Sequence, residues 1–230
     1  MNLTIHLGRR GLLFLIIGLT WLVLPQRPAV AKADTDAAVA TVRELADGIW
    51  ALLARTDLDE PARLDRLLAL FESKTDVNLL ARLVLGRYWR ELPDDQKPTY
   101  VRLFRDVVLR RLAERLNRYA GETQGEMDEH FRIRESIPAG KRDVLVRSEV
   151  VPKSGKPIAV DWRLRARDGE PKIIDVIIEG VSLLVSQRSE FAAVIEKQGL
   201  DGLLADLAAR AKQDTSQAAH QSGPVTLALR

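Results

Sequence analysis

Apolar residues in the first half of the chain recur every three to four positions, which is the period of an amphipathic α-helix. Asp76 is placed to cap a short helix over residues 77–85, which Gly86 ends. Pro93, with Asp94 and Asp95, opens a long helix, since acidic side chains favour the positive end of a helix. The predicted helices of this half cover residues 36–55, 61–71, 77–85 and 93–119.

The period then changes to two, which indicates strands with one apolar face. In residues 157–166 the alternation is clearest, with Ile158, Val160, Trp162 and Leu164 on one face. Short glycine-bearing links join the strands, which favours antiparallel hairpins. Four strands are predicted over 127–136, 143–151, 157–166 and 171–179, and two closing helices over 187–197 and 201–212, separated by Gly199. Helices, a meander and helices again indicate an α+β fold in which the helices cover one sheet face.

The amino-terminal segment has the features of a secretory signal peptide. Arg9 and Arg10 precede an apolar run over residues 11–24, which is shorter than the ~20 residues of a transmembrane helix. Small residues before position 34 fit the cleavage rule. We therefore expect residues 1–33 to be removed, residues 34–212 to form a single domain, and residues 213–230 to be a disordered tail. The mature protein is expected in the periplasm.

Charge and composition narrow the range of functions. The chain has 35 basic and 32 acidic residues, but four of the basic residues lie in residues 1–33, which contain no acidic ones. The balance that remains, 31 against 32, gives no support for nucleic-acid binding. The absence of cysteine excludes disulfides, thiolate metal sites and cysteine nucleophiles. No cluster of metal ligands is visible in the sequence, and we expect no metal and no cofactor.

Two longer segments carry a recognisable pattern. They are LARLVLGRYWRELPDDQKPTYVRLFRDVVLRRLAERLNRYAG, residues 80–121, and IIDVIIEGVSLLVSQRSEFAAVIEKQGLDGLLADL, residues 173–207. In this order they resemble the MlaC family of periplasmic phospholipid carriers. The resemblance implies a curved four-stranded antiparallel meander covered by helices, with an apolar cavity between the layers that holds acyl chains.

The same resemblance implies a function and partners. A protein of this kind is not an enzyme and shuttles phospholipid between membranes, acting as a monomer. Its partners would be an outer-membrane lipoprotein–porin complex and an inner-membrane ABC transporter with an MCE-type subunit. Such a carrier needs no cofactor.

Apolar positions on the short helix, the long helix and the sheet form the candidate lipid site. From spacing alone they fit an ordinary packed core. The resemblance instead makes them the lining of a cavity. The predicted lipid-binding residues are Leu80, Val84, Tyr88, Tyr100, Phe104, Val108, Val146, Val160, Trp162, Val176, Ile178 and Leu184.

An apolar row on the predicted long helix turns basic along one face. Phe104 and Val107 continue at helical steps into Arg111, Arg115 and Arg118. Guanidinium groups bind phosphate well, so these arginines are candidates for contact with a lipid headgroup at the cavity mouth. The alternative is an ordinary solvated helix face.

Other functions stay open at this point. Asp161 and Asp175 lie in neighbouring predicted strands, where two carboxylates could serve acid–base chemistry. Arg163 and Arg165 share the face with Asp161, which favours surface ion pairs. His130 is expected to point outward on the alternation. A sibling group, HpnM, implies a hopanoid or other polycyclic lipid as cargo, and a non-catalytic adaptor with a filled core is a further alternative.

Overall fold

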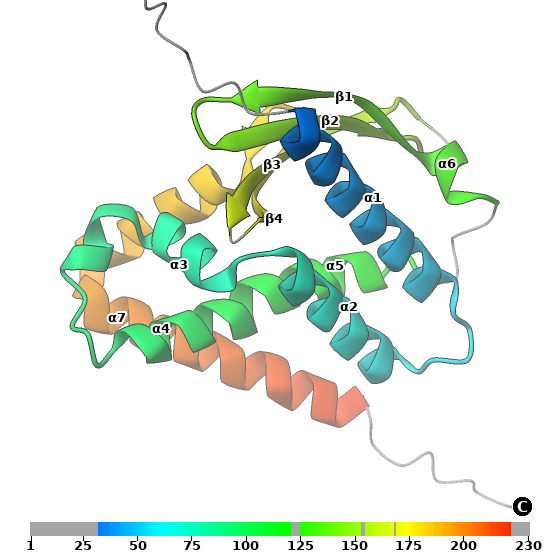
Figure 1. Cartoon of the computed structure of the whole chain (residues 1–230). Helices are drawn as coiled ribbons and strands as arrows, with labels where there is room; N and C mark the ends of the chain where they lie inside the picture. The colour runs from blue at the N-terminus through cyan, green and yellow to red at the C-terminus, as the bar shows by residue number, and fades with distance from the viewer. Residues whose placement is uncertain (1–31, 121–124, 153–154, 168, 222–230) are drawn as a thin grey trace, which may run out of the picture.

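Five antiparallel strands form one open sheet, and helices cover one of its faces (Figure 1). This computed structural model describes residues 32–120, 125–152, 155–167 and 169–221. The strands pair in chain order and are β1 (Phe131–Ala139), β2 (Asp143–Val150), β3 (Ile158–Arg167), β4 (Glu170–Ile178) and β5 (Val181–Ser182). The helical elements are α1 (Lys32–Ala54), α2 (Glu60–Lys74), α3 (Val77–Leu85), η1 (Gly86–Arg90), α4 (Lys97–Phe104), η2 (Arg105–Leu109), α5 (Arg110–Asn117), α6 (Met127–His130) and α7 (Leu183–Gln221). The predicted α+β class is confirmed.

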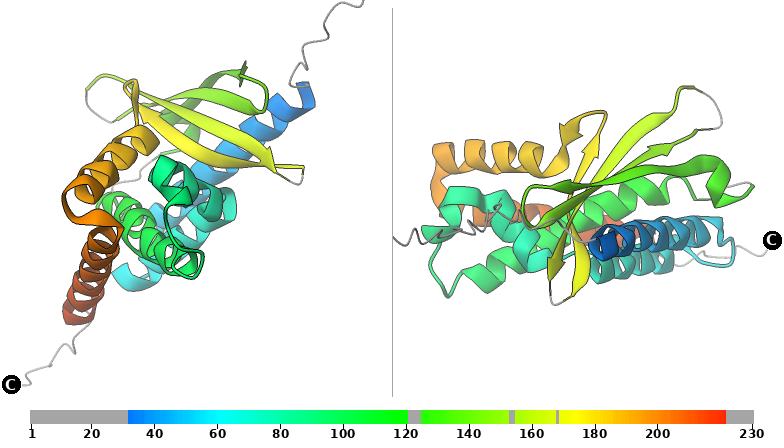
Figure 2. Two further views of the ribbon diagram at one scale, coloured as in Figure 1. Left: turned by 90° about the vertical axis from the view of Figure 1, so that its left-hand side faces the viewer. Right: turned by 45° about the horizontal axis from the view of Figure 1, so that its top comes forward.

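The sheet has one strand more than the four predicted. The additional strand β5 has only two residues, Val181 and Ser182, which pair with Ile178 and Ile177 of β4. A run this short contains no alternation to detect, and for this reason the sequence pattern missed it. Bulges at Arg134 in β1 and Ile174 in β4 shift the register of the neighbouring pairs. Each extra residue bends its strand, and the sheet is strongly twisted (Figure 2).

One helical turn, α6, replaces the start of the first predicted strand. Asp128 and Glu129 lie in this turn, where acidic side chains are favoured near the positive helix end. The ring of His130 stacks on Trp50 with ring centroids 4.9 Å apart, and its Nδ1 lies 3.0 Å from the carbonyl oxygen of Val151. His130 is therefore half-buried, and the expectation that it points outward is wrong.

The helix over residues 77–85 is confirmed as α3. The Asp76 carboxylate accepts a hydrogen bond from the backbone N–H of Leu79 at 3.0 Å, and Gly86 adopts a φ of 60° after the last turn. The predicted long helix starts later, at Lys97, because residues 93–96 form a separate turn closed by the Gln96 N–H and the Pro93 carbonyl. A π-helical segment, η2, interrupts it between α4 and α5.

The closing helices are continuous except at Gly199. There the backbone takes φ 73° and ψ 179°, which divides α7 into the two predicted helices and bends it (Figure 2, left). The helix continues to Gln221 instead of residue 212, and the next glycine and proline in the sequence are Gly223 and Pro224.

Both ends of the chain extend beyond the described part. The predicted signal peptide lies almost entirely outside the described residues, as does the last stretch of the predicted tail. Within the described ranges, no helix has the length and apolarity that crossing a bilayer requires.

Two apolar clusters hold the layers together. The first joins α1, α2 and α5 to the helix-facing side of the sheet and includes Leu45, Leu67 and Val146. The second lies among α3, α4 and both halves of α7, around Tyr100 and Phe104. The Tyr100 hydroxyl donates to the carbonyl oxygen of Ala81 at 2.9 Å, and burial raises the pKa of this phenol, so it stays neutral.

A buried arginine ties the α1–α2 connection to α5. Arg63 donates from Nη2 to the carbonyl oxygens of Arg55 and Leu58, at 2.9 and 2.7 Å, and from Nη1 to Asn117 Oδ1 at 3.3 Å. Arg63 and Asn117 are both buried. A charged donor that bonds several acceptors at once fixes the geometry of the segments that carry them.

We expect Arg63→Met to lower the free energy of unfolding by about 2 kcal/mol, because two carbonyls and one amide lose their donor. Urea unfolding of the purified protein measures this. Arg66→Met is the matched control, since Arg66 is exposed on the same helix, and it should change the value by less than ~0.5 kcal/mol. Equal effects of the two variants would contradict the assigned role of Arg63.

Candidate functional site

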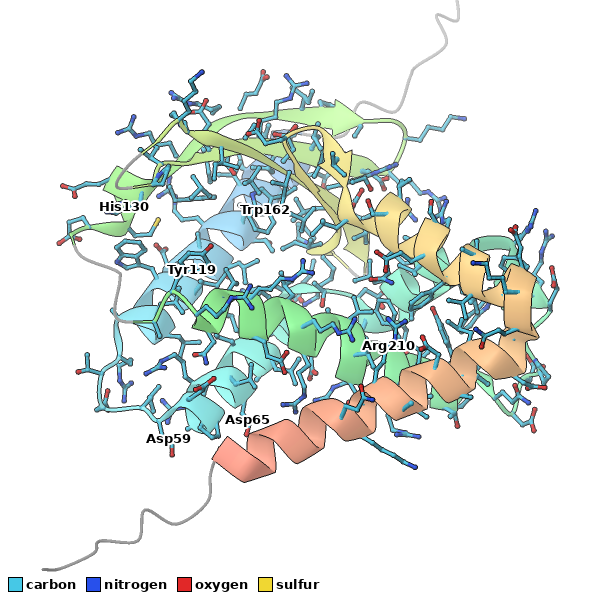
Figure 3. All side chains as sticks on the ribbon, turned by 180° about the vertical axis from the view of Figure 1, so that it is seen from behind. Asp59, Asp65, Tyr119, His130, Trp162 and Arg210 are labelled. Atoms are coloured by element: carbon cyan, nitrogen blue, oxygen red, sulfur yellow. The ribbon has the colours of Figure 1, made fainter. Side chains whose placement is uncertain are left out.

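The helix-facing side of the sheet is a continuous apolar surface. Cross-strand pairing places Val146 opposite Trp162 and Trp162 opposite Val176, so these three side chains share one face. All three pack in the cluster with α1, α2 and α5. Figure 3 shows Trp162 directed from the sheet toward the helices. Tyr119, which follows α5, lies on the helical side, opposite the sheet.

Burial on this face decreases toward one end of the sheet. Val146 is fully buried and Val160 is 7% exposed, whereas Ile158 and Ile178 are each 38% exposed. Val150 pairs with Ile158 and Val181 pairs with Ile178, and both partners are exposed too. A contiguous group of exposed apolar side chains is uncommon and marks a surface that contacts another apolar group. We call Val150, Ile158, Ile178, Val181 and the neighbouring Val185 the apolar rim.

The polar atoms in the middle of this face are satisfied within the sheet. Ser148 is 2% exposed, and its hydroxyl donates to the carbonyl oxygen of Val160 at 2.6 Å. The Ser148 hydroxyl oxygen in turn accepts the indole N–H of Trp162 at 2.9 Å. The bond fixes the orientation of the indole, whose ring also meets Phe131 edge-on. The face therefore combines an apolar character with polar groups that need no external partner.

The structure divides the predicted lipid-binding residues into two groups. Those on the sheet, Val146, Val160, Trp162, Val176 and Ile178, lie together on the helix-facing side. The helical ones pack in the second cluster against α7; they are Leu80, Val84, Tyr88, Tyr100, Phe104, Val108 and Leu184. Of the rim residues, only Ile178 was among the predicted lipid-binding residues; Ser148 and Tyr119 were not among them either. Their signal was present in part, because Val150 and Ile158 share the strand parity of Val146 and Trp162.

The predicted basic row lies on the exposed side of α5. Arg111, Arg115 and Arg118 are all exposed, and none of them forms an ion pair within the described part of the chain. Tyr119 follows directly and is 56% exposed. Three unpaired guanidiniums beside an aromatic ring form a surface that can bind an anionic group.

The acidic residues considered for catalysis have structural partners. Asp175 is buried and accepts hydrogen bonds from the Ser182 hydroxyl at 2.6 Å and the Leu184 N–H at 3.0 Å, which fixes the start of α7. Asp161 lies 3.9 Å from Arg147. Asp161 therefore forms a surface ion pair, as expected, but with Arg147; Arg163 and Arg165 pair with Asp143.

Asp143 is a second buried acid, besides Asp175. Its carboxylate oxygens form ion pairs with Nη2 of Arg163 and Nε of Arg165, at 2.6 Å each. Burial alone would raise the pKa of this carboxyl group, but the two guanidiniums outweigh burial and hold the pKa below its usual range. Among the described residues, no group of three or more histidine, aspartate and glutamate side chains is arranged to hold a metal ion.

Comparison with known proteins agrees with this architecture. The fold is that of α+β proteins in which helices cover one face of an open antiparallel sheet. The sequence model of the family described as MlaC protein matches residues 43–209. Because the match covers most of the chain, this chain belongs to the MlaC family.

Two individual proteins show the same relationship. The intermembrane phospholipid transport system binding protein MlaC of Haemophilus influenzae is 24% identical over 134 residues, which are 56% of this chain and 59% of that protein. The match thus spans less than two thirds of that relative. A phospholipid-binding protein from Ralstonia solanacearum, solved in complex with a phospholipid, is similar in structure with a TM-score of 0.63 and 25% identity. That match covers 76% of this chain and 96% of the solved one.

The Ser148–Trp162 bond can be tested by Ser148→Ala. We expect a loss of about 1–2 kcal/mol in the free energy of unfolding, because the buried indole N–H and the Val160 carbonyl lose their partner. Ser136→Ala is the control, since Ser136 lies on the same face of β1, opposite Val146. It should cost less than ~0.5 kcal/mol in the same urea titration. If Ser136→Ala lowered the free energy of unfolding by as much as Ser148→Ala, the assigned role of the Ser148 hydroxyl would be contradicted.

Proposed function

We propose that this protein is a periplasmic lipid carrier that holds the acyl chains of a phospholipid against the helix-facing side of its sheet. The observation that carries the proposal is the apolar face itself, which runs from buried Val146 to the exposed apolar rim. A packed core has no reason to continue into a row of exposed apolar side chains on the same face. The similarity to a protein solved with a phospholipid gives independent support.

The energetics of transfer explain why such a carrier is useful. Two acyl chains contain roughly thirty methylenes, and exposing each to water costs ~0.8 kcal/mol, or ~24 kcal/mol in total. A protein interior that matches the membrane interior removes most of this barrier. It does not need to bind the lipid more tightly than the bilayer does. The carrier should therefore recognise the chains and tolerate different headgroups.

The remaining parts of the proposal follow from this role. Residues 34–212 form the lipid-binding unit, in which the apolar cavity lies between the sheet and the helices. Residues 1–33 direct export and are removed. The carrier exchanges lipid, without catalysis or cofactor, between an outer-membrane complex and an inner-membrane ABC transporter with an MCE-type subunit. The name of the Haemophilus relative, an intermembrane phospholipid transport binding protein, supports the transport role.

The lipid site is tested by Val160→Trp. Val160 lies on the helix-facing side between Trp162 and the apolar rim, so an indole there should occupy space that the acyl chains need. We expect a several-fold lower lipid uptake from phosphatidylglycerol vesicles, measured by mass spectrometry of the re-isolated protein. Ala159→Trp places the same ring on the outward face of β3 and should leave uptake unchanged. If the space were a filled core, Val160→Trp would instead cost ~1–3 kcal/mol through overpacking, and uptake in the folded fraction would not change.

The basic row is tested by replacing Arg111, Arg115 and Arg118 together with glutamine. If the row contacts the headgroup phosphate, the triple variant should release phosphatidylglycerol to acceptor vesicles faster by at least threefold, because charge-assisted contacts to phosphate are lost. The measurement is the rate of transfer of a fluorescent phospholipid. An equal rate for the variant and the wild-type protein would assign the row to an ordinary solvated helix face.

A further inference from the structure

A groove lies at the end of the β2–β3 pair opposite the apolar rim. It has a volume of about 880 Å³ and lies between α3, η1 and α4 on one side and the β1–β2 turn with the end of β3 on the other. Arg82, Arg102 and Arg142 line it, one each from α3, α4 and the turn. Apolar side chains of Leu79, Trp89 and Val101 lie between them. The elements on the helical side of the groove are at the left of Figure 1.

The charge of the groove is only partly compensated. Three further basic residues line it, but each has an acidic partner: Lys97 pairs with Asp94, Arg165 with Asp143, and Arg105 with Glu72. Arg82 and Arg142 are exposed and form no ion pair within the described residues. Arg102 reaches Asp106 only at 3.9 Å. Three separate elements therefore direct guanidiniums into one groove. Two of these groups, those of Arg82 and Arg142, have no ion pair within the described residues, and the Asp76 carboxylate also lines the groove.

An aromatic ring among these charges gives the groove an apolar anchor point. Trp89 meets Tyr100 edge-on, and the ammonium group of Lys97 lies 5.3 Å from the centre of its ring. Val101 and Pro98 of α4 lie beside it in the lining. Tryptophan and arginine are the residues that most often contribute binding energy at protein interfaces, and here they occur together.

We propose that this groove docks an acidic segment of a second protein, with an apolar side chain seated near Trp89 and carboxylates on Arg82, Arg102 and Arg142. A bilayer surface is flat on this scale and does not fit a concave groove lined on two sides. The ends of this chain do not fit either, because residues 1–31 and 222–230 contain no acidic residue. The inference goes beyond the proposed function and does not depend on lipid binding.

The test is photo-cross-linking in the cells that make the full chain, with benzoylphenylalanine in place of Asn78, which lines the groove and is exposed. The cross-linked peptides are identified by tandem mass spectrometry. We expect one protein other than this chain, joined through a segment rich in aspartate and glutamate. The same probe at Arg66, on the exposed face of α2, should not give this product.

Charge reversal distinguishes specific docking from proximity. The probe stays at Asn78 in every sample. The double variant Arg82→Glu with Arg142→Glu should lower the yield of the cross-linked product at least tenfold. The control, Arg66→Glu with Arg132→Glu, makes an equal charge change at exposed positions outside the groove and should leave the yield unchanged. Replacing the acidic residues of the partner segment with lysine should restore the yield for the groove variant. A milder pair, Arg82→Gln with Arg142→Gln, should give an intermediate loss if reversal harms folding.

Several results would overturn the docking proposal. One is a cross-link to the wrong target, that is, to lipid only, to a second copy of the chain, or to a segment without acidic residues. The others are an absence of cross-links and a cross-linking yield that charge reversal leaves unchanged. The lipid content of each sample separates the two proposals. Protein that carries no lipid and takes up none from vesicles, but still cross-links to an acidic segment, would refute the carrier and retain the docking groove. Lipid-loaded protein that fails to cross-link would do the reverse.

Discussion

The pairing of β2 with β3 and of β3 with β4 is the constraint on which the rest of the structure depends. It sets Val146, Trp162 and Val176 side by side and directs all three toward the helices. Because side chains alternate along a strand, a slip of one residue in either pair would turn an apolar row to solvent and bring charged side chains such as Arg163 inside. The Ser148–Trp162 hydrogen bond joins two of these strands, β2 and β3, in the observed register.

The helices complete this face without covering all of it. α1 lies against the sheet, and α5 lies beyond it with Tyr119 at its end (Figures 1 and 3). α3, α4 and α7 meanwhile form an apolar cluster of their own, to which no strand among the described residues contributes a side chain. The molecule thus has a packed helical cluster next to a sheet face that ends in exposed apolar side chains. This arrangement is expected of a protein that accommodates a ligand without losing its fold.

Local sequence signals predicted most of the fold, because each such element carries its own signal. Asp76 and Gly86 defined both ends of α3, Gly199 divided α7, and alternation located β2, β3 and β4. Two of the misses concern elements whose signals depend on distant partners. The two-residue strand β5 exists only through its pairing with Ile177 and Ile178, and the α6 turn depends on its packing between Trp50 and Val151.

The candidate site was predictable on the sheet and less so on the helices. Parity identified Val146, Val160, Trp162, Val176 and Ile178 as one face, whereas no local pattern shows that α7 folds back onto α3 and α4. That packing places Tyr100 and Phe104 in a helical cluster of their own. The groove around Arg82 and Arg142 was likewise invisible, because its residues come from three elements far apart in the sequence.

The most direct test of the account is native mass spectrometry of the wild-type protein purified from its own cells, followed by extraction and identification of any bound lipid. A phospholipid carrier should show discrete adducts of phospholipid mass, and these should persist in protein that has not been exposed to detergent. Adducts of hopanoid mass would keep the carrier but change its cargo. Lipid-free protein that also takes up no phospholipid from vesicles would contradict the central claim that the helix-facing side of the sheet holds acyl chains.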